Sequence, residues 1–289
     1  MASLDKYKKI LEKNKLILSS VDPKLIPEKT EGRDSIDPDL ARRLRGMGIK
    51  VPGSQGVSDI YTIIAFDTTG SMESCINAVR RNIGEITNEL LEKEDNVHIM
   101  VGGVGEYGDN PYTLQLKEFR KDPSELKMDL ENIRNTYGGG ACQVSLELLF
   151  QELNKKYIQM DKKYSLIVFT DQIAHGQDNQ ERNPRADYKK ELEKLKENLG
   201  AFYIVGCAGS NSAVIDLQKE LLDPGNENEK HILLEEVLAD SNLIPSLIIA
   251  LIKRTISLEK EMEYLAELRN GTPEQRRIAQ ELETKYLSD

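Results

Sequence analysis

Short apolar runs alternate with longer amphipathic segments, and this alternation restricts the fold more than any other feature of the sequence. The apolar runs are rich in β-branched and aromatic residues, and they cover residues 60–66, 97–104, 112–119, 165–170, 202–207 and 231–234. Segments of helical period lie between and after them, at residues 72–92, 124–136, 142–156, 188–199, 213–222 and 243–256. Strands that alternate with helices predict a mainly parallel sheet.

One apolar run departs from this order. Residues 112–119 follow residues 97–104 after the short turn Gly108-Asp109-Asn110-Pro111, and no crossover helix fits into that interval. A short turn joins antiparallel neighbours, so this strand is expected at an edge. The predicted fold is therefore α/β and doubly wound, with a mostly parallel six-stranded sheet, one antiparallel edge strand and helices on both faces, as in Rossmann-like proteins.

The chain divides into a main domain and two extensions. Residues 1–56 carry a lysine-rich helical pattern, a stretch with Pro23, Pro27 and Pro38 and a turn-rich linker, which predict a helical extension. Residues 57–256 hold the alternating pattern and form the main domain. Residues 257–289 are strongly charged, and Thr272-Pro273-Glu274 is typical of a helix start, so a C-terminal helical extension is expected.

Composition narrows the classes of partner and compartment. The formal charge of -10 disfavours nucleic acid and anionic membranes, because both require clustered cations. The longest apolar stretch, residues 243–252, contains Pro245 and has about half the length needed to span a bilayer. Cys75, Cys142 and Cys207 are widely spaced without a CxxC pair, which favours reduced thiols. With no signal-peptide pattern, a cytoplasmic protein is expected.

A polar turn follows the first apolar run. Asp67, Thr69 and Ser71 alternate along this turn, directly after the run Tyr61–Phe66. Ligands of open α/β sheets bind at the carboxyl ends of the strands, and a carboxylate with two hydroxyls suits Mg²⁺ or Mn²⁺. The alternative is that one of these side chains only caps the following helix.

The pattern Asp67-x-Thr69-x-Ser71 resembles the DxSxS or DxTxS motif of the metal-ion-dependent adhesion site in von Willebrand factor A domains. Thr170-Asp171, at another strand end, resembles the third motif of that family. The resemblance covers residues 57–256, roughly two thirds of the chain. It implies that Thr69 and Ser71 touch the metal directly, and that Asp67 and Asp171 support it directly or through water.

Three further segments resemble a group of intracellular A domains that includes those attached to atypical alpha-kinases. They are residues 103–109, 137–140 and 171–176, which resemble the YRD, GGGDxPE and DxPPHG signatures of that group. The sequence has no recognisable kinase catalytic region, so kinase activity is not expected.

The second motif of the family is incomplete. Relatives place a Thr or Asp ligand after the glycines, where this chain has Ala141. Thr136, Cys142, Gln143 and Ser145 are the candidates to replace it, although Thr136 precedes the glycines and a thiol is a poor ligand for Mg²⁺. A metal-free scaffold that keeps the fold therefore remains an alternative.

Other polar residues near strand ends carry weaker signals. His175 is a candidate general base, but one histidine without a nucleophile is little support for catalysis. Glu106 and Asp109 either line the crevice or form a solvated turn. Gly102–Gly105 lacks the GK[ST] ending of a phosphate loop, so nucleotide binding is not expected.

These observations favour a metal-ion-dependent protein-interaction module over an enzyme. A cation held by Asp67, Thr69, Ser71 and Asp171 would keep an open position, which an acidic residue of a partner protein could fill. The alternative from another class is a metal-dependent hydrolase or phosphoryl-transfer enzyme, with His175 or Glu106 as its base.

Overall fold

The computed structural model describes residues 59–94, 96–136, 143–158, 162, 164–177, 186–207, 212–234 and 243–287. The predicted N-terminal extension, residues 1–56, lies outside the described residues. Residues 59–289 group into one compact unit.

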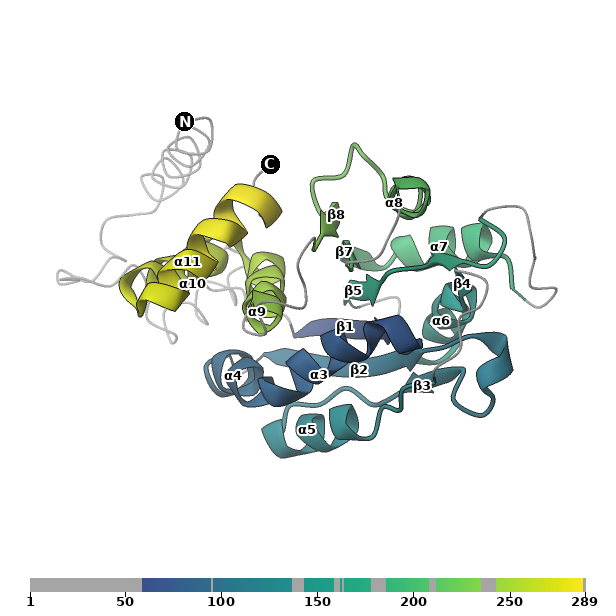
Figure 1. The fold of residues 1–289 in the computed structure, drawn as a ribbon, viewed down its shortest axis with the longest axis horizontal. Coiled ribbons are helices and arrows are strands. Elements are labelled where there is room, and N and C mark those ends of the chain that lie inside the picture. The colour runs from purple at the N-terminus through teal and green to yellow at the C-terminus, as the bar shows by residue number, and fades with distance from the viewer. Residues whose placement is uncertain are drawn as a thin grey trace, which may run out of the picture. The chain divides into compact units, whose positions relative to one another are not determined.

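The centre of this unit is a six-stranded sheet (Figure 1). In spatial order the strands are β3 (Leu114–Leu116), β2 (Val97–Val104), β1 (Ile60–Asp67), β5 (Tyr164–Thr170), β7 (Leu199–Gly206) and β8 (Glu229–Leu233). All neighbours are parallel except β2 and β3, which are antiparallel. The predicted sheet, including its antiparallel edge strand, is confirmed.

Helices surround this sheet. Their bounds are α3 (Glu73–Arg81), α4 (Ile83–Thr87), α5 (Pro123–Glu131), α6 (Leu146–Glu152), α7 (Tyr188–Lys196), α8 (Ser212–Lys219), α9 (Leu243–Ile256), α10 (Leu258–Asn270) and α11 (Pro273–Glu281). Short π-helical turns follow α4, α6 and α11. Among the described residues, no helix combines the length and the apolar character that crossing a bilayer requires.

Two expected helices differ in detail from those observed. The segment 72–92 is divided at Asn82, whose backbone leaves the helical region and whose side chain donates to the carbonyl of Ala78. Asn and the nearby Gly84 are both weak helix formers, which accounts for the break. The helix expected from residue 142 begins only at Leu146, because Gln143–Val144 form strand β4 and pair with β6 (Ile173–Ala174).

Strand side chains alternate between two cores. Ile64 and Phe66 of β1 belong to a cluster with buried residues of α3, α5 and α9. Ile63 and Ala65 belong to a second cluster with buried residues of α6 and α7. Because successive strand residues point to opposite faces, both faces of the sheet are covered, as the doubly wound fold requires.

A polar pair lies inside the central strand pair. The hydroxyls of Thr62 on β1 and Ser165 on β5 are 2.8 Å apart and buried. The two residues are also direct partners in the strand register. The hydrogen bond therefore satisfies two groups that are shielded from water.

The C-terminal extension is part of the core. Tyr264 and Leu268 of α10, Ile278 of α11 and Leu282 after it are buried in the same cluster as α9. The helix start predicted at Thr272 is the N-cap of α11, whereas α10 was not predicted as a separate helix of this charged extension. Its N-terminus is capped by Ser257, whose hydroxyl accepts from the N–H of Lys260.

An ion-paired lysine lies where α9 meets the π-helical turn at residues 88–92. Lys253 is buried, and its ammonium lies 2.8 Å from Glu89 and 3.7 Å from Glu94. Lys93 and Lys260 pair with the same two carboxylates. These charges hold α9 to the segment before β2.

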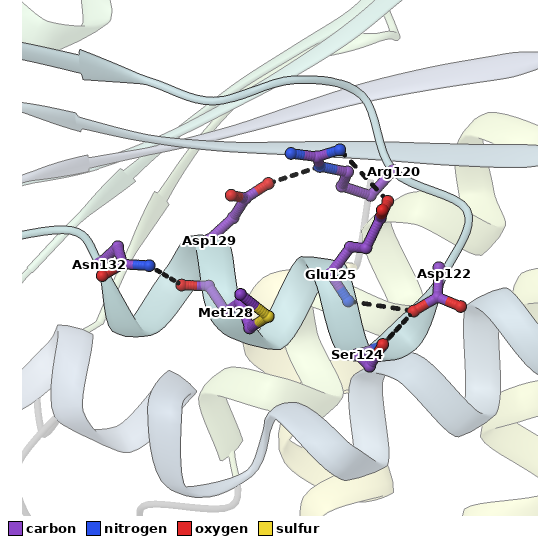
Figure 2. A network of polar contacts seen from close by, with 7 residues as sticks. All are labelled: Arg120, Asp122, Ser124, Glu125, Met128, Asp129 and Asn132. Atoms are coloured by element: carbon purple, nitrogen blue, oxygen red, sulfur yellow. Dashed lines mark hydrogen bonds and ion pairs between the residues drawn. The ribbon is translucent and has the colours of Figure 1, made fainter.

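Helix α5 shows how a short surface helix is fixed (Figure 2). Asp122 caps it by accepting from the N–H groups of Ser124 and Glu125. Arg120, which precedes the cap, pairs with Asp129 at 2.7 Å and Glu125 at 3.2 Å. The cap and the ion pairs fix α5 to the end of the segment that leaves β3.

Candidate functional site

The strand order has a switch point at its centre. From β1 the chain proceeds to β2 and β3 on one side, and from β5 it proceeds to β7 and β8 on the other. Ligands of open α/β sheets bind outside the carboxyl ends of the strands at such a point. Asp67 ends β1 and Asp171 directly follows β5, so the two predicted carboxylates lie there.

The carboxylate of Asp67 is buried and extensively hydrogen-bonded. Its Oδ1 accepts from the backbone N–H of Thr69 at 2.9 Å and from the Thr69 hydroxyl at 2.6 Å. Its Oδ2 accepts from the hydroxyl of Thr170 at 2.8 Å. Thr170 is the last residue of β5. The contact therefore ties the end of β1 to the end of its neighbouring strand β5.

Burial changes the acidity of Asp67. Loss of hydration raises the pKa of this carboxyl to about 7, against the hydrogen bonds from Thr69 and Thr170, which lower it. The negative charge of Asp171 adds to the rise. The two carboxylates therefore repel each other, and a cation between them would relieve that repulsion.

Unsatisfied oxygens remain around this pair. Asp171 Oδ1 and Gln172 Oε1 are buried without a hydrogen-bond partner among the described residues. The Gln172 amide Nε2 donates to Thr69 Oγ1 at 3.1 Å. Buried polar atoms are almost always paired in proteins, so two orphaned oxygens beside one carboxylate call for an explanation.

Helix capping does not explain the motif. Thr69 precedes the 3₁₀ turn Gly70–Met72 and Met72 precedes α3, and neither side chain makes a capping hydrogen bond within the described residues. Asp67 instead accepts from the adjacent turn and from β5. Ser71 lies exposed in the same turn.

The donor set fits a hard divalent cation. Asp67, Asp171, Thr69 and Ser71 supply only oxygen atoms, two of them from carboxylates. Where the structure is described, no three His, Cys, Asp or Glu side chains gather around a common point, so a site of that kind is not present there. The fit is therefore to Mg²⁺ or Mn²⁺ held by two carboxylates, hydroxyls and further neutral oxygens.

The candidates for the second motif lie in several places. Thr136 is held to Thr68, since its N–H and its hydroxyl both donate to the Thr68 carbonyl, at 2.8 and 3.2 Å. Gly105 allows this approach, because a Cβ there would lie 3.0 Å from Thr136 Oγ1. Cys142 lies outside the described residues, and Gln143 and Ser145 are buried at β4 and at the start of α6.

Glu106 and Asp109 form a turn. The N–H of Glu106 donates to Asp109 Oδ2 at 2.8 Å, and the Glu106 side chain accepts in return from the backbone of Asp109. Asp109 therefore has a structural role after β2. The phosphate-loop glycines, as expected, lie in a strand, because Gly102 and Gly103 belong to β2.

His175 belongs to a second buried polar cluster, whose other members the sequence pattern did not indicate. Glu147 of α6 accepts from the Tyr107 hydroxyl at 2.5 Å and from the backbone N–H of His175 at 3.3 Å. The Tyr107 and His175 rings lie 4.9 Å apart between centroids. Burial raises the pKa of Glu147 to about 7. The pairing of β4 with β6 brings α6 next to the loop that carries His175. The only indication of this cluster in the sequence was an acidic residue within an apolar helix.

Two thiols are neighbours, Cys75 in the first turn of α3 and Cys207 directly after β7. Cys75 and Cys207 are buried, and a hydrogen bond between the two side chains together with burial raises the pKa of the Cys207 thiol. The charges of Asp171 and Asp67 raise it further, so the thiols are neighbours of the carboxylate pair.

Comparison with solved structures shows a likeness in fold. The chain is similar to the pilus adhesin SpaC from Lactobacillus rhamnosus GG in its open conformation, with 11% identity and a TM-score of 0.50 over 70% of this chain. A second SpaC structure gives a TM-score of 0.52 at 11% identity and the same coverage. This chain spans only 31% of the adhesin's length in either case.

A third similar structure is proximal thread matrix protein 1 from the mussel byssus, at 14% identity and a TM-score of 0.46 over 67% of this chain and 48% of that one. No family model matches the chain, and no curated protein matches it. The likeness to the two SpaC structures is one of fold alone.

Proposed function

We propose that this protein is a divalent-cation-dependent protein-interaction module. The observation that carries the proposal is the pair Asp67 and Asp171 at the switch point of the sheet, where Asp171 Oδ1 is buried without a hydrogen-bond partner among the described residues. A cation shared by the two carboxylates accounts for the orphaned oxygen and offsets their repulsion.

In this proposal the described residues orient the donors. Thr170 holds Asp67 Oδ2, and the Thr69 N–H holds Asp67 Oδ1. Thr69 Oγ1 donates to Asp67 and accepts from Gln172, which leaves it one lone pair. Ser71 is exposed and adds a hydroxyl at the side that faces solvent.

The partner is proposed to present a carboxylate. Mg²⁺ or Mn²⁺, when bound, supplies a positive centre that accepts one more oxygen ligand. Two aspartates balance the charge of the cation, and the hydroxyls of Thr69 and Ser71 add no negative charge. The cation would therefore keep its affinity for an incoming Glu or Asp. A charge-assisted contact of this kind, partly shielded from water, is worth roughly 2–5 kcal/mol when one end is removed.

The test combines metal binding with partner capture. We expect calorimetry with Mn²⁺ to show one site in the wild-type protein and none in Asp67→Ala or Asp171→Asn. Pull-downs from native lysate should recover a partner that a chelator and both variants release. Asp216→Asn, an exposed aspartate on α8, is the matched control and should behave as wild type. Unchanged Mn²⁺ binding in Asp67→Ala would contradict the proposal.

The Glu147 cluster supports a metal-dependent hydrolase as a second candidate. A buried carboxyl with a pKa of about 7, in contact with Tyr107 and the His175 backbone, suits proton transfer. This candidate predicts Mn²⁺-dependent hydrolysis of a phosphoester or peptide that Glu147→Gln and His175→Ala abolish. If the protein binds Mn²⁺ fully but hydrolyses none of these substrates, the hydrolase is excluded and the interaction module remains as the proposed function.

A further inference from the structure

Gln172 is held in place from three directions beside the carboxylate pair. Its backbone N–H donates to Thr170 Oγ1 at 2.9 Å, and its carbonyl accepts from Gln218 Nε2 at 2.8 Å. Its side-chain Nε2 donates to Thr69 Oγ1 at 3.1 Å. The side chain is 94% buried, since its exposed fraction is 6%. Its carboxamide is therefore fixed against one of the proposed metal ligands.

The other end of the same carboxamide is unsatisfied. Gln172 Oε1 is buried and has no hydrogen-bond partner among the described residues. An orphaned buried acceptor is destabilising, because it has lost its hydration without gaining a hydrogen bond. If Gln172 served only to hold Thr69, nothing would offset this destabilisation. A side chain that carries a donor alone could hold Thr69 equally well.

The Gln172 side chain lies close enough to Thr69 for the two residues to share a cation. Ligands at about 2.1 Å from Mg²⁺, at right angles in an octahedron, lie about 3 Å from one another. The nitrogen Nε2 of this carboxamide lies 3.1 Å from Thr69 Oγ1, so Oε1, which is bonded to the same carbon, is held beside the same hydroxyl.

We propose that Gln172 Oε1 is a direct ligand of the cation, an inference that rests on the proposed function. Asp67, Thr69, Ser71 and Asp171 supply at most four side chains, and octahedral coordination needs six ligands. Gln172 adds a neutral oxygen, so the two aspartates still balance the charge of the cation. One position remains for water or for the partner carboxylate.

The experiment separates ligation by Oε1 from orientation of Thr69 by Nε2. Gln172→Met removes both groups at nearly constant size, and Gln172→Glu keeps the oxygens but cannot donate to Thr69. Mn²⁺ affinity is measured by electron paramagnetic resonance, and the waters bound to Mn²⁺ are counted from water-proton relaxation. Thermal unfolding without metal establishes that each variant is folded.

We expect Gln172→Met to weaken Mn²⁺ binding by about 10-fold to 100-fold and to add about one water to the bound ion. Gln172→Glu should bind Mn²⁺ at least as tightly as wild type, with an unchanged water count. Gln177→Met is the matched control, because Gln177 lies buried in the same loop with both amide ends hydrogen-bonded, to Ala174 and Leu217. Its Mn²⁺ affinity and water count should equal those of wild type.

The contrary results are distinct. An unchanged water count in Gln172→Met, or weaker binding in Gln172→Glu, would overturn ligation by Gln172 and leave it as a positioning residue for Thr69. Those results would spare the proposed function as long as Asp67→Ala still abolishes binding. A wild-type protein that does not bind Mn²⁺ would overturn both proposals.

Discussion

Glu147 is the residue whose chemistry departs most from its position in the sequence. It lies in the first turn of α6 among apolar residues, and its side chain is fully buried. Its two oxygens accept from Tyr107 and from the His175 backbone, and these bonds only partly offset the lost hydration. The neutral form is therefore favoured in the folded protein relative to the unfolded chain.

This residue makes stability depend on pH. The pKa of Glu147 is about 7 when folded and about 4.5 when unfolded, so the folded state binds more protons between these values. Its contribution to the free energy of unfolding is largest at low pH and falls by up to about 1.4 kcal/mol per pH unit as pH rises through this window. We expect urea unfolding of Glu147→Gln to show a shallower loss of stability from pH 5 to about 7.

Asp67 contributes in the same direction, because its pKa is also raised to about 7. The comparison is therefore between the slopes of the variant and of the wild type, both without metal. Equal slopes in the two proteins would contradict a neutral, buried Glu147.

Among single residues, the sequence indicated those that belong to a local pattern along the chain. Asp67 is the last residue of β1 and Thr69 comes two positions later, so their proximity is fixed by the chain itself. Glu147 and Tyr107 meet because strand β4 leads into α6 through Ser145, whose N–H donates to the Gly105 carbonyl at 3.1 Å. A two-residue strand has no periodicity that would reveal it.

Among the elements, α9 depends on charge as well as on apolar packing. Its Lys253 lies under the π-helical turn at residues 88–92 and beside the Tyr264 ring, 5.7 Å from the centroid. Glu89 and Glu94 retain Lys93 and Lys260 if Lys253 is removed. The negative charges of Glu89 and Glu94 would therefore still be partly neutralised by these two lysines.

Replacing this lysine tests the contribution of the buried ion pairs. We expect Lys253→Met to lower the free energy of unfolding by roughly 2–3 kcal/mol, because it leaves two carboxylates with fewer partners in a buried place. Lys156→Met is the control, since Lys156 pairs with Glu152 at the surface and should change stability little. Chemical denaturation measures both, and equal effects would contradict the argument.

Element boundaries were predicted unevenly. Residues 243–256 coincide with α9, because a long apolar stretch with a clear end leaves little choice. The continuous helix expected at 72–92 was wrong, since hydrophobic spacing continues across Asn82 while the backbone does not. Helix α10 was not foreseen, because its charged residues conceal the apolar positions Tyr264, Leu265 and Leu268.

For the molecule as a whole, the C-terminal extension belongs to the folding unit. We expect Leu282→Ala, at a fully buried position after α11, to cost about 2–4 kcal/mol in a single unfolding transition. Leu258→Ala in α10 is the control, because Leu258 is 50% exposed and should change stability by less than about 0.5 kcal/mol. A separate early transition in Leu282→Ala would show that the extension unfolds on its own.

The architecture was accessible from the sequence because alternation of strands and helices has few topological solutions. The short Gly-Asp-Asn-Pro turn, residues 108–111, was enough to predict an antiparallel edge strand. The site was less accessible, because Gln172 and Glu147 act through contacts between distant segments. Such contacts depend on the finished packing of the sheet and its loops.

The hydroxyl pair Thr62 and Ser165 has a consequence for how the two central strands find each other. A slip of β5 by one residue would leave each hydroxyl facing an apolar neighbour, with two unpaired polar groups inside the protein. Wrong alignments are thereby penalised at the middle of the sheet, five residues before Asp67 and Thr170 come side by side at its rim. The accuracy of the proposed cation site at this rim would thus originate in the alignment of two small alcohols in the interior.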